Sequence, residues 1–246
     1  MAETGGIERL RAEKEALETI DCTCVVKLLE TWQDTSHVFV ATKLMLVGDL
    51  KRRLETSPDK GYLQVADLGV SKRIYAQKTQ TYVGTPMYMA PEVLAGTRYG
   101  QAVDIWALGV IVFEMAKGRT PFETTESDCP VTLASRSRPL QLLENFDLVE
   151  EESKCRDIIA KAMTFDPEER VNNVGVGFAA LRSHPWFLEF DWEELRANRL
   201  PAPWVPDGSS LSFEDGDLWQ GEDFSEPYTG DQAIFEGSNV SPVFLK

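Results

Sequence analysis

Histidine and cysteine, the side chains that most often bind zinc, are scarce in this sequence. Its 246 residues include two histidines, His37 and His184. The four cysteines are Cys22, Cys24, Cys129 and Cys155. They form no pair of C-x-x-C motifs, and both histidines lie far from them in the sequence. We therefore expect reduced thiols in a reducing compartment, and neither a zinc site nor a disulfide framework.

Positive charge is also in deficit. The chain has 25 Lys and Arg against 40 Asp and Glu, which gives a net charge of −15. Nucleic acids and anionic membrane surfaces attract basic proteins, so we expect neither of them as a partner. The charge is compatible with protein or peptide substrates that carry basic residues.

Long apolar runs and export signals are missing as well. Residues Met1 to Thr4 carry no basic-then-apolar signal and no glycine for myristoylation. No apolar run approaches the roughly 20 residues that span a bilayer. We expect a soluble intracellular protein, located in the cytoplasm or also in the nucleus. With 43% hydrophobic residues, the chain can form a real core.

The most informative stretch of the sequence is Ala66-Asp67-Leu68-Gly69. It follows residues 62–65, where apolar and polar side chains roughly alternate as in a strand. An acidic residue at the end of a strand, followed by glycine, can hold a cation over a cleft, but such a triplet alone also fits an ordinary turn. Two more motifs, Gly84-Thr85-Pro86 and Ala90-Pro91-Glu92, follow it; their order and spacing resemble those of the protein kinases, in which the aspartate of the first motif holds Mg²⁺.

Apolar periodicity predicts the surrounding elements. Residues 7–20 have the pattern of an amphipathic surface helix, whereas residues 101–117 are apolar on nearly every face, which is typical of a helix inside a domain. Residues 153–163 predict a third helix. Two short strands are expected at residues 24–29 and 38–41, joined by a polar turn.

Together these motifs resemble the eukaryotic Ser/Thr protein kinases, and within them the cyclic-nucleotide-dependent members of the AGC group. The resemblance covers residues 7 to about 215. It implies an α+β fold with a truncated small N-lobe at residues 1–56, a mainly helical C-lobe at residues 57–190, and an acidic, partly disordered AGC-type tail at residues 191–246. It also implies ATP and Mg²⁺ as cofactors.

The resemblance assigns nucleotide-side roles to several residues. Glu13 falls where the family's C helix places the glutamate that pairs with the ATP-gripping lysine. Thr42 matches the gatekeeper, and Lys43 and Met45 lie in the hinge, whose backbone reads the adenine edge. Asp49 matches an acidic residue that contacts the ribose and a substrate arginine, but it also fits an ordinary acid at a helix N-terminus.

Asp67 matches the family's metal-binding aspartate and is the predicted Mg²⁺ ligand, with Leu68 in place of the usual Phe. Thr81 matches the activating phosphosite, which implies an upstream kinase; an ordinary loop hydroxyl is the alternative. Thr85 and Glu114 match substrate-binding positions, and Glu114 would read a basic residue of the substrate.

Four further residues have structural roles by resemblance. Glu92 and Arg170 match a buried ion pair of the C-lobe. Asp104 matches the N-terminal anchor of the F helix, and we expect it to be a buried carboxylate that lacks its usual partner, which is costly. We expect His184 to be a core or capping histidine rather than a base.

Several catalytic elements of the family are absent from the sequence. No G-x-G-x-x-G loop and no lysine strand precede Glu13. Residues 51–59 stand where the long E helix and the H-R-D-L-x-x-x-N loop are expected. That loop supplies the Asp that accepts the substrate proton and the Asn that binds a second Mg²⁺.

We therefore expect a protein Ser/Thr kinase by descent, with little or no phosphotransfer by this chain. One alternative is a pseudokinase or fragment that binds protein partners without catalysis. The other is a chain that does not fold stably alone, because the missing E helix uncovers one flank of residues 101–117.

Overall fold

The computed structural model describes residues 2–33, 38–43, 45, 63–72, 78–122, 150–175 and 178–201. The chain divides into two compact units, Met1–Ser71 with Glu194–Lys246 and Lys72–Glu193. The sequence-based boundary at residue 56 differs from this division, because residues 64–68 hydrogen-bond to residues 13–26 within the first unit. Each unit is described by itself.

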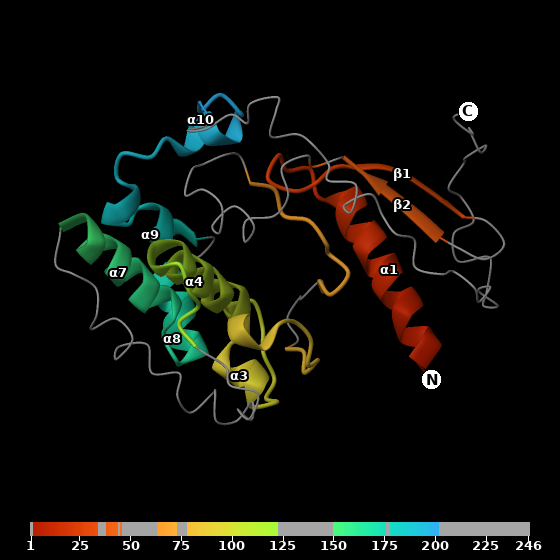
Figure 1. Cartoon of the computed structure of the whole chain (residues 1–246), viewed down its shortest axis with the longest axis horizontal. Helices are drawn as coiled ribbons and strands as arrows, with labels where there is room; N and C mark the ends of the chain where they lie inside the picture. The colour runs from red at the N-terminus through yellow and green to blue at the C-terminus, as the bar shows by residue number, and fades with distance from the viewer. Residues whose placement is uncertain are drawn as a thin grey trace. The chain divides into compact units, whose positions relative to one another are not determined.

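The first unit contains one long helix and a two-stranded sheet (Figure 1). Helix α1 spans Ala2–Thr19, so it begins five residues before the predicted start. Strands β1 (Leu28–Gln33) and β2 (Val38–Thr42) pair antiparallel, with an irregularity in register between Leu28 and Glu30. The aromatic rings of Trp32 and Phe39 stack across the pair at 5.1 Å between centroids.

The predicted strand at residues 24–29 is wrong in its first half. Regular pairing begins only at Leu28, and Val25 instead forms an isolated parallel bridge with Val65. The alternating residues 62–65 were expected to form a strand, but among the described residues 63–65 only Val65 pairs, through this bridge. Because partners about 40 residues apart create the bridge, no local pattern could indicate it.

The second unit is built around helix α4, Ala102–Lys117. Helices α7 (Glu150–Ala162) and α8 (Pro167–Val174) pack against it and against each other (Figure 1). The shorter elements of this unit are η1 (Pro86–Tyr88), α3 (Pro91–Leu94), α9 (Ala179–Arg182) and η4 (Pro185–Phe187). Helix α10 (Trp192–Arg196) begins at the end of this unit and crosses its boundary.

The core of the second unit lies between these helices. Trp106, Val110 and Phe113 of α4 are fully buried against Ile159 and Met163. The close approach of α4 to the end of α7 requires a glycine at position 109. A Cβ there would lie 2.7 Å from the Met163 Cγ and 2.9 Å from the Ala162 Cβ. The expectation of an interior helix therefore holds for one face of α4.

The other face of α4 is not fully covered. Leu108 and Met115 expose 38% and 41% of their surface, so the helix is not buried all round as its composition suggests. None of the described helices is long and apolar enough to cross a membrane.

The predicted boundary of the C-terminal tail also shifts. The Trp192 ring packs edge-on against Phe187 and Phe190, with centroids 5.0 and 4.8 Å apart, so residues just after 190 pack with the second unit. The rest of the predicted tail, from residue 202 onward, lies outside the described residues.

Candidate functional site

The turn at Asp67-Leu68-Gly69 has an uncommon backbone. Asp67 has φ of 59°, in the left-handed region that non-glycine residues rarely adopt. Its Oδ1 accepts a hydrogen bond from the Gly69 amide at 3.2 Å, and its side chain is exposed. Aspartate tolerates this conformation because its carboxylate can bond the local backbone. The bond to the Gly69 amide therefore fixes the direction of the Asp67 carboxylate.

Glu13 of α1 holds the same turn. Its Oε1 accepts a hydrogen bond from the Leu68 amide at 3.2 Å, across 55 residues of sequence. Its Oε2 lies 3.2 Å from where a Cβ on Gly69 would stand, so a larger residue at 69 would press on this carboxylate. The two residues that the sequence placed on the nucleotide side, Glu13 and Asp67, are therefore brought to one turn.

The segment before Asp67 is hydrogen-bonded to residues 23–26, which precede strand β1. The Val65 amide donates to the Cys24 carbonyl at 2.7 Å, and the Val26 amide donates to the Val65 carbonyl at 2.9 Å. The Gln64 side chain donates to the Thr23 carbonyl at 2.7 Å. Three hydrogen bonds thus fix the Val25–Val65 bridge, and Asp67 follows two residues after it.

The predicted hinge follows β2. Thr42 ends the strand opposite Leu28, and the Lys43 amide donates to the Lys27 carbonyl at 2.9 Å. The side chains of Thr42, Lys43 and Met45 are exposed. Among the described residues, no hydrogen bond or ion pair joins them to Asp67. Asp49 lies outside the described residues, so the structure does not place it.

Asp67 can supply one oxygen ligand to a metal ion. Within the described ranges, no group of three or more His, Cys, Asp or Glu side chains is arranged to hold a metal. Protein sites usually bind Mg²⁺ through one or two carboxylates, with phosphate oxygens and water completing the shell. The donor set therefore fits a Mg²⁺ that arrives with a nucleotide, and it does not fit a tight metal site of the protein alone.

In the second unit, Thr81 lies in a small polar cluster. The Lys72 ammonium donates to the hydroxyls of Thr79 (3.3 Å) and Thr81. The Tyr99 hydroxyl donates to the Thr81 carbonyl at 2.6 Å, and Thr79 and Tyr99 exchange backbone hydrogen bonds. The predicted phosphosite thus has a cation at its hydroxyl and a fixed backbone.

Glu114 is paired with a tyrosine that the sequence analysis did not single out. The Tyr88 hydroxyl donates to the Glu114 Oε2 at 2.6 Å. Burial, followed by the bond to Glu114 and its charge, raises the pKa of Tyr88 to about 12. Thr85 lies three residues before, where its carbonyl accepts from the Tyr88 amide and its side chain is exposed. Two predicted substrate positions, Thr85 and Glu114, therefore contact the same tyrosine.

Arg170 and Glu92 form a bidentate ion pair in the core. The N–O distances are 2.8 and 3.1 Å, and the Arg170 side chain is fully buried. The remaining guanidinium hydrogens go to the carbonyls of Thr164, Ala102 and Phe165 at 2.8–3.1 Å. All five donors of this arginine are used, which ties α3, the start of α4 and the α7–α8 connection together.

The expectation that Asp104 is buried is wrong. Asp104 is exposed in the first turn of α4, so water still reaches its carboxylate. Neighbouring protein atoms desolvate it in part and raise its pKa. The acid lies near the helix N-terminus, where the helix dipole stabilises a negative charge.

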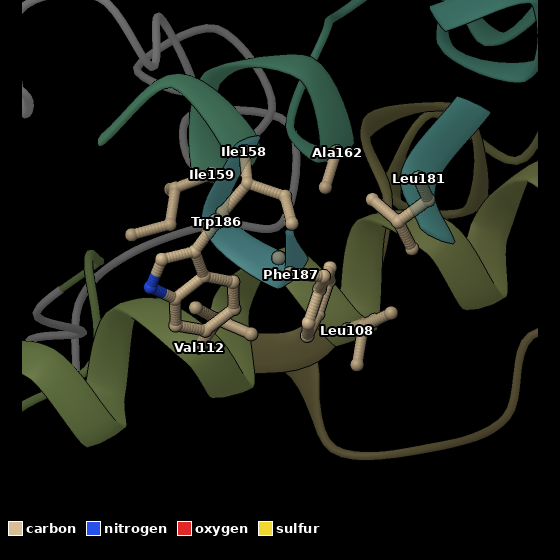
Figure 2. A pocket seen from close by; sticks show the side chains of 9 residues that line it. Leu108, Val112, Ile158, Ile159, Ala162, Leu181, Trp186 and Phe187 are labelled. Atoms are coloured by element: carbon tan, nitrogen blue, oxygen red, sulfur yellow. The ribbon is translucent and has the colours of Figure 1, made fainter. Parts of the chain in front are cut away.

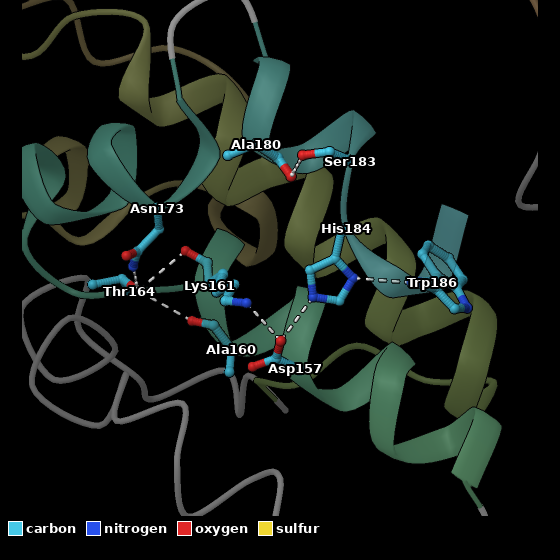
Figure 3. A network of polar contacts seen from close by, with 9 residues as sticks. All are labelled: Asp157, Ala160, Lys161, Thr164, Asn173, Ala180, Ser183, His184 and Trp186. Carbon is cyan, nitrogen blue, oxygen red and sulfur yellow. Dashed lines mark hydrogen bonds and ion pairs between the residues drawn. The ribbon is translucent and has the colours of Figure 1, made fainter. Parts of the chain in front are cut away.

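His184 is a capping histidine, as the sequence predicted. It is 4% exposed, and its Nδ1 accepts the Trp186 amide at the start of η4, at 3.2 Å. The proton therefore sits on Nε2, which faces the Asp157 Oδ2 at 2.7 Å. Figure 3 shows His184 and Lys161 converging on this carboxylate, with Lys161 at 2.6 Å. The network joins α7 to η4 and leaves the histidine no role as a base.

This network gives a pH-dependent prediction. Burial acts to raise the pKa of Asp157, but the hydrogen bonds and charges of Lys161 and His184 outweigh it and lower that pKa. A lowered folded-state pKa adds stability above the unfolded carboxyl's pKa of about 3.9, and that stability is lost as the pH falls through the folded value. Asp157→Asn should therefore be less stable than the unchanged chain at pH 7 in urea unfolding, and the difference should shrink toward pH 3. Asp21→Asn, an exposed loop variant, is the control; an equal Asp157→Asn difference at both pH values would reject the assignment.

Comparison with known proteins identifies the family. The model of the protein kinase domain matches residues 56–187, more than half of the chain. The chain is 28% identical over 237 residues to cGMP-dependent protein kinase 2 of Homo sapiens, covering 80% of this chain and 30% of that protein. It is 34% identical over 169 residues to the RAC serine/threonine-protein kinase of Drosophila melanogaster, covering 68% of this chain and 26% of that protein. It is 32% identical over 182 residues to the cAMP-dependent protein kinase catalytic subunit PRKX of Homo sapiens, covering 72% of this chain and 48% of that protein.

These matches and the mixed helix-and-sheet fold define the class as a protein kinase domain. The chain belongs to the protein kinase family, among the Ser/Thr kinases of the AGC group. The recognition made from the sequence motifs is confirmed. The chain spans about a third of the length of cGMP-dependent protein kinase 2 (30%) and about half of that of PRKX (48%). The roles of individual residues stay predictions.

Sequence reasoning missed two residues that shape the site. Tyr88 contacts Glu114, and Tyr99 contacts the Thr81 carbonyl. Their partners are 26 and 18 residues away, so no spacing rule indicates them.

Proposed function

We propose that this chain binds a Mg²⁺–nucleotide through Asp67 and transfers phosphate slowly or not at all. The observation that carries the proposal is the Asp67 turn, with its left-handed φ, exposed carboxylate and support from Glu13. In this family, phosphoryl transfer consists almost entirely of positioning and electrostatic stabilisation. When bound, Mg²⁺ would neutralise phosphate charge; the chain's own part is to present the Asp67 oxygen and to fix its direction.

The expectation of slow transfer rests on the absence of an H-R-D motif from the sequence. A catalytic H-R-D loop needs a histidine followed by Arg and Asp. His37 is followed by Val38 and His184 by Pro185, so neither belongs to such a loop. Without its Asp, nothing in the described residues is assigned to accept the proton of a substrate hydroxyl.

The second unit supports a proposed substrate class of peptides with basic residues. Glu114 is a half-buried carboxylate on α4, held by the Tyr88 hydroxyl at 2.6 Å. A carboxylate oriented in this way suits a Lys or Arg of a substrate. Thr81 suits an upstream kinase, because a phosphate on its hydroxyl would meet the Lys72 ammonium already beside it.

Mg-ATP binding tests the proposal. A ligand that binds only the folded chain raises its melting temperature. The unchanged chain should therefore melt higher with Mg-ATP than without it, and Asp67→Asn, which weakens the metal ligand, should lose most of this shift. Asp21→Asn, in the same unit, should keep it. No shift in the unchanged chain, or an equal shift in Asp67→Asn, would refute the proposed site.

A specific hollow favours a second candidate, a non-catalytic interaction module. Leu108 and Val112 of α4 form one wall of an apolar hollow of about 50 Å³, and Trp186 and Phe187 form another (Figure 2). Nucleotide and drug-sized ligands need several hundred Å³, so this hollow fits an apolar side chain of a partner protein instead. This candidate predicts a partner complex that survives Asp67→Asn and is lost in Leu108→Asp. A complex lost in Asp67→Asn and kept in Leu108→Asp would reject it.

A further inference from the structure

Cys22 and Cys24 lie together in a hydrogen-bonded turn of the first unit. The Val25 amide donates to the Cys22 carbonyl at 3.1 Å, which closes the turn, and both cysteines are free and exposed. Nothing in the proposed kinase function uses them. The Cys22 sulfur lies 3.3 Å from the Cys24 amide nitrogen, so it is folded back onto the residue that carries the second thiol.

The two thiols are chemically unequal. The Cys22 Sγ accepts a hydrogen bond from the Cys24 amide at 3.3 Å, so the two residues contact each other within the turn. Partial burial, followed by the neighbouring Cys22 sulfur, raises the pKa of the Cys24 thiol. A raised pKa leaves less thiolate at Cys24, so Cys24 is assigned the resolving role. This is the arrangement of a reactive thiol with a second thiol ready to resolve it.

We propose that Cys22 and Cys24 form a reversible dithiol redox site that hydroperoxides oxidise. The Cys22 thiolate attacks one peroxide oxygen; the O–O bond breaks, and after protonation the products are a sulfenic acid on Cys22 and the alcohol of the hydroperoxide, which is water when the oxidant is hydrogen peroxide. The Cys24 sulfur then attacks the Cys22 sulfur, an S–S bond forms, and the hydroxyl leaves as water with the Cys24 proton. The two thiols lose two electrons, and the peroxide gains them.

The turn that would be oxidised also fixes the segment that leads to Asp67. The Cys24 carbonyl accepts the Val65 amide, and the Thr23 carbonyl between the two cysteines accepts the Gln64 side chain, each at 2.7 Å. A disulfide between residues two apart closes a small ring and is strained, which distorts this turn and makes the bond easy to reduce. Oxidation should therefore loosen the Val25–Val65 bridge.

Peptide mapping by mass spectrometry tests the site in the full chain. After hydrogen peroxide treatment and alkylation of the remaining thiols, the peptide with Cys22 and Cys24 should have lost two hydrogens and resist alkylation, and dithiothreitol should reverse both changes. Cys22 should react at least about tenfold faster than the half-buried Cys155, because peroxide reaches the exposed Cys22 sulfur more easily. Equal rates, or oxidation without this disulfide, would overturn the proposal.

Serine variants separate the two roles. Cys24→Ser removes the resolving thiol, so a sulfenic acid should accumulate on Cys22 and be trapped by dimedone. Cys22→Ser should leave Cys24 no more reactive than Cys155, and the control Cys155→Ser should form the disulfide as the unchanged chain does. Trapping on Cys24 in the Cys22→Ser variant at the original rate would contradict the assignment.

Amide hydrogen exchange tests the coupling. The Val65 amide, which donates to the Cys24 carbonyl, should exchange faster in the oxidised chain than in the reduced chain. The Val93 amide, bonded to Ala90 in the other unit, serves as the internal reference. Unchanged exchange at Val65 in a fully oxidised sample would overturn the link to the bridge. None of these readouts depends on nucleotide binding.

Discussion

Arg170→Met should lower the free energy of unfolding by about 3–5 kcal/mol, because it leaves the Glu92 carboxylate buried without its partner. The guanidinium also supplies hydrogen bonds to three carbonyls, and it lies 5.1 Å from the centre of the Trp106 ring. Urea unfolding of the unchanged chain and the variant measures the difference.

Two further variants isolate the cause of that loss. Arg170→Lys keeps the charge but not the five-donor fork, so it should still be clearly destabilised. The double variant Glu92→Gln with Arg170→Met removes the stranded charge and should recover part of the stability. A loss under about 1 kcal/mol in Arg170→Met, the value expected of an exposed ion pair, would contradict the description of a buried pair.

Phe113→Ala should cost about 3–5 kcal/mol of stability, since it removes a fully buried ring from the centre of the second unit. Phe113 is 1% exposed on the face of α4 that meets the core. The helices around it are closely packed, since a Cβ at position 109 would lie 2.7 Å from the Met163 Cγ, so we expect them to fill the cavity only in part.

Phe165→Ala is the matched control for this variant. Phe165 is 55% exposed, so its truncation should change stability by less than about 1 kcal/mol. Chemical unfolding of both variants gives the comparison. A similar loss in the two would mean that α4 is not the centre of the core.

The second unit could be predicted largely from its sequence, and the first only in part. The continuous apolar run of residues 101–117 indicates α4 (Ala102–Lys117), and the pattern at 153–163 indicates α7 (Glu150–Ala162) to within three residues. Local periodicity determines such helices. The Val25–Val65 bridge and the support of Leu68 by Glu13 depend on contacts 40 and 55 residues apart, and no local signal reports them.

Burial was the property that sequence reasoning judged least well. Asp104 was expected in the interior because it matches the N-terminal anchor of the kinase F helix, yet it lies in the exposed first turn of α4. Leu108 and Met115 are exposed for a related reason: composition shows that a helix can be buried, but the neighbours decide which faces are. Tyr88, by contrast, carried no motif, and it holds Glu114.

A phosphotransfer assay tests the central claim most directly, namely that this kinase-family chain binds a nucleotide without appreciable transfer. The full chain is incubated with γ-labelled Mg-ATP and a peptide rich in arginine, and the label on the peptide is counted. The account predicts no incorporation above the enzyme-free blank at an ATP concentration that raises the melting temperature. Incorporation at the roughly 1–100 per second of active kinases, abolished by Asp67→Asn, would contradict it and establish an active enzyme.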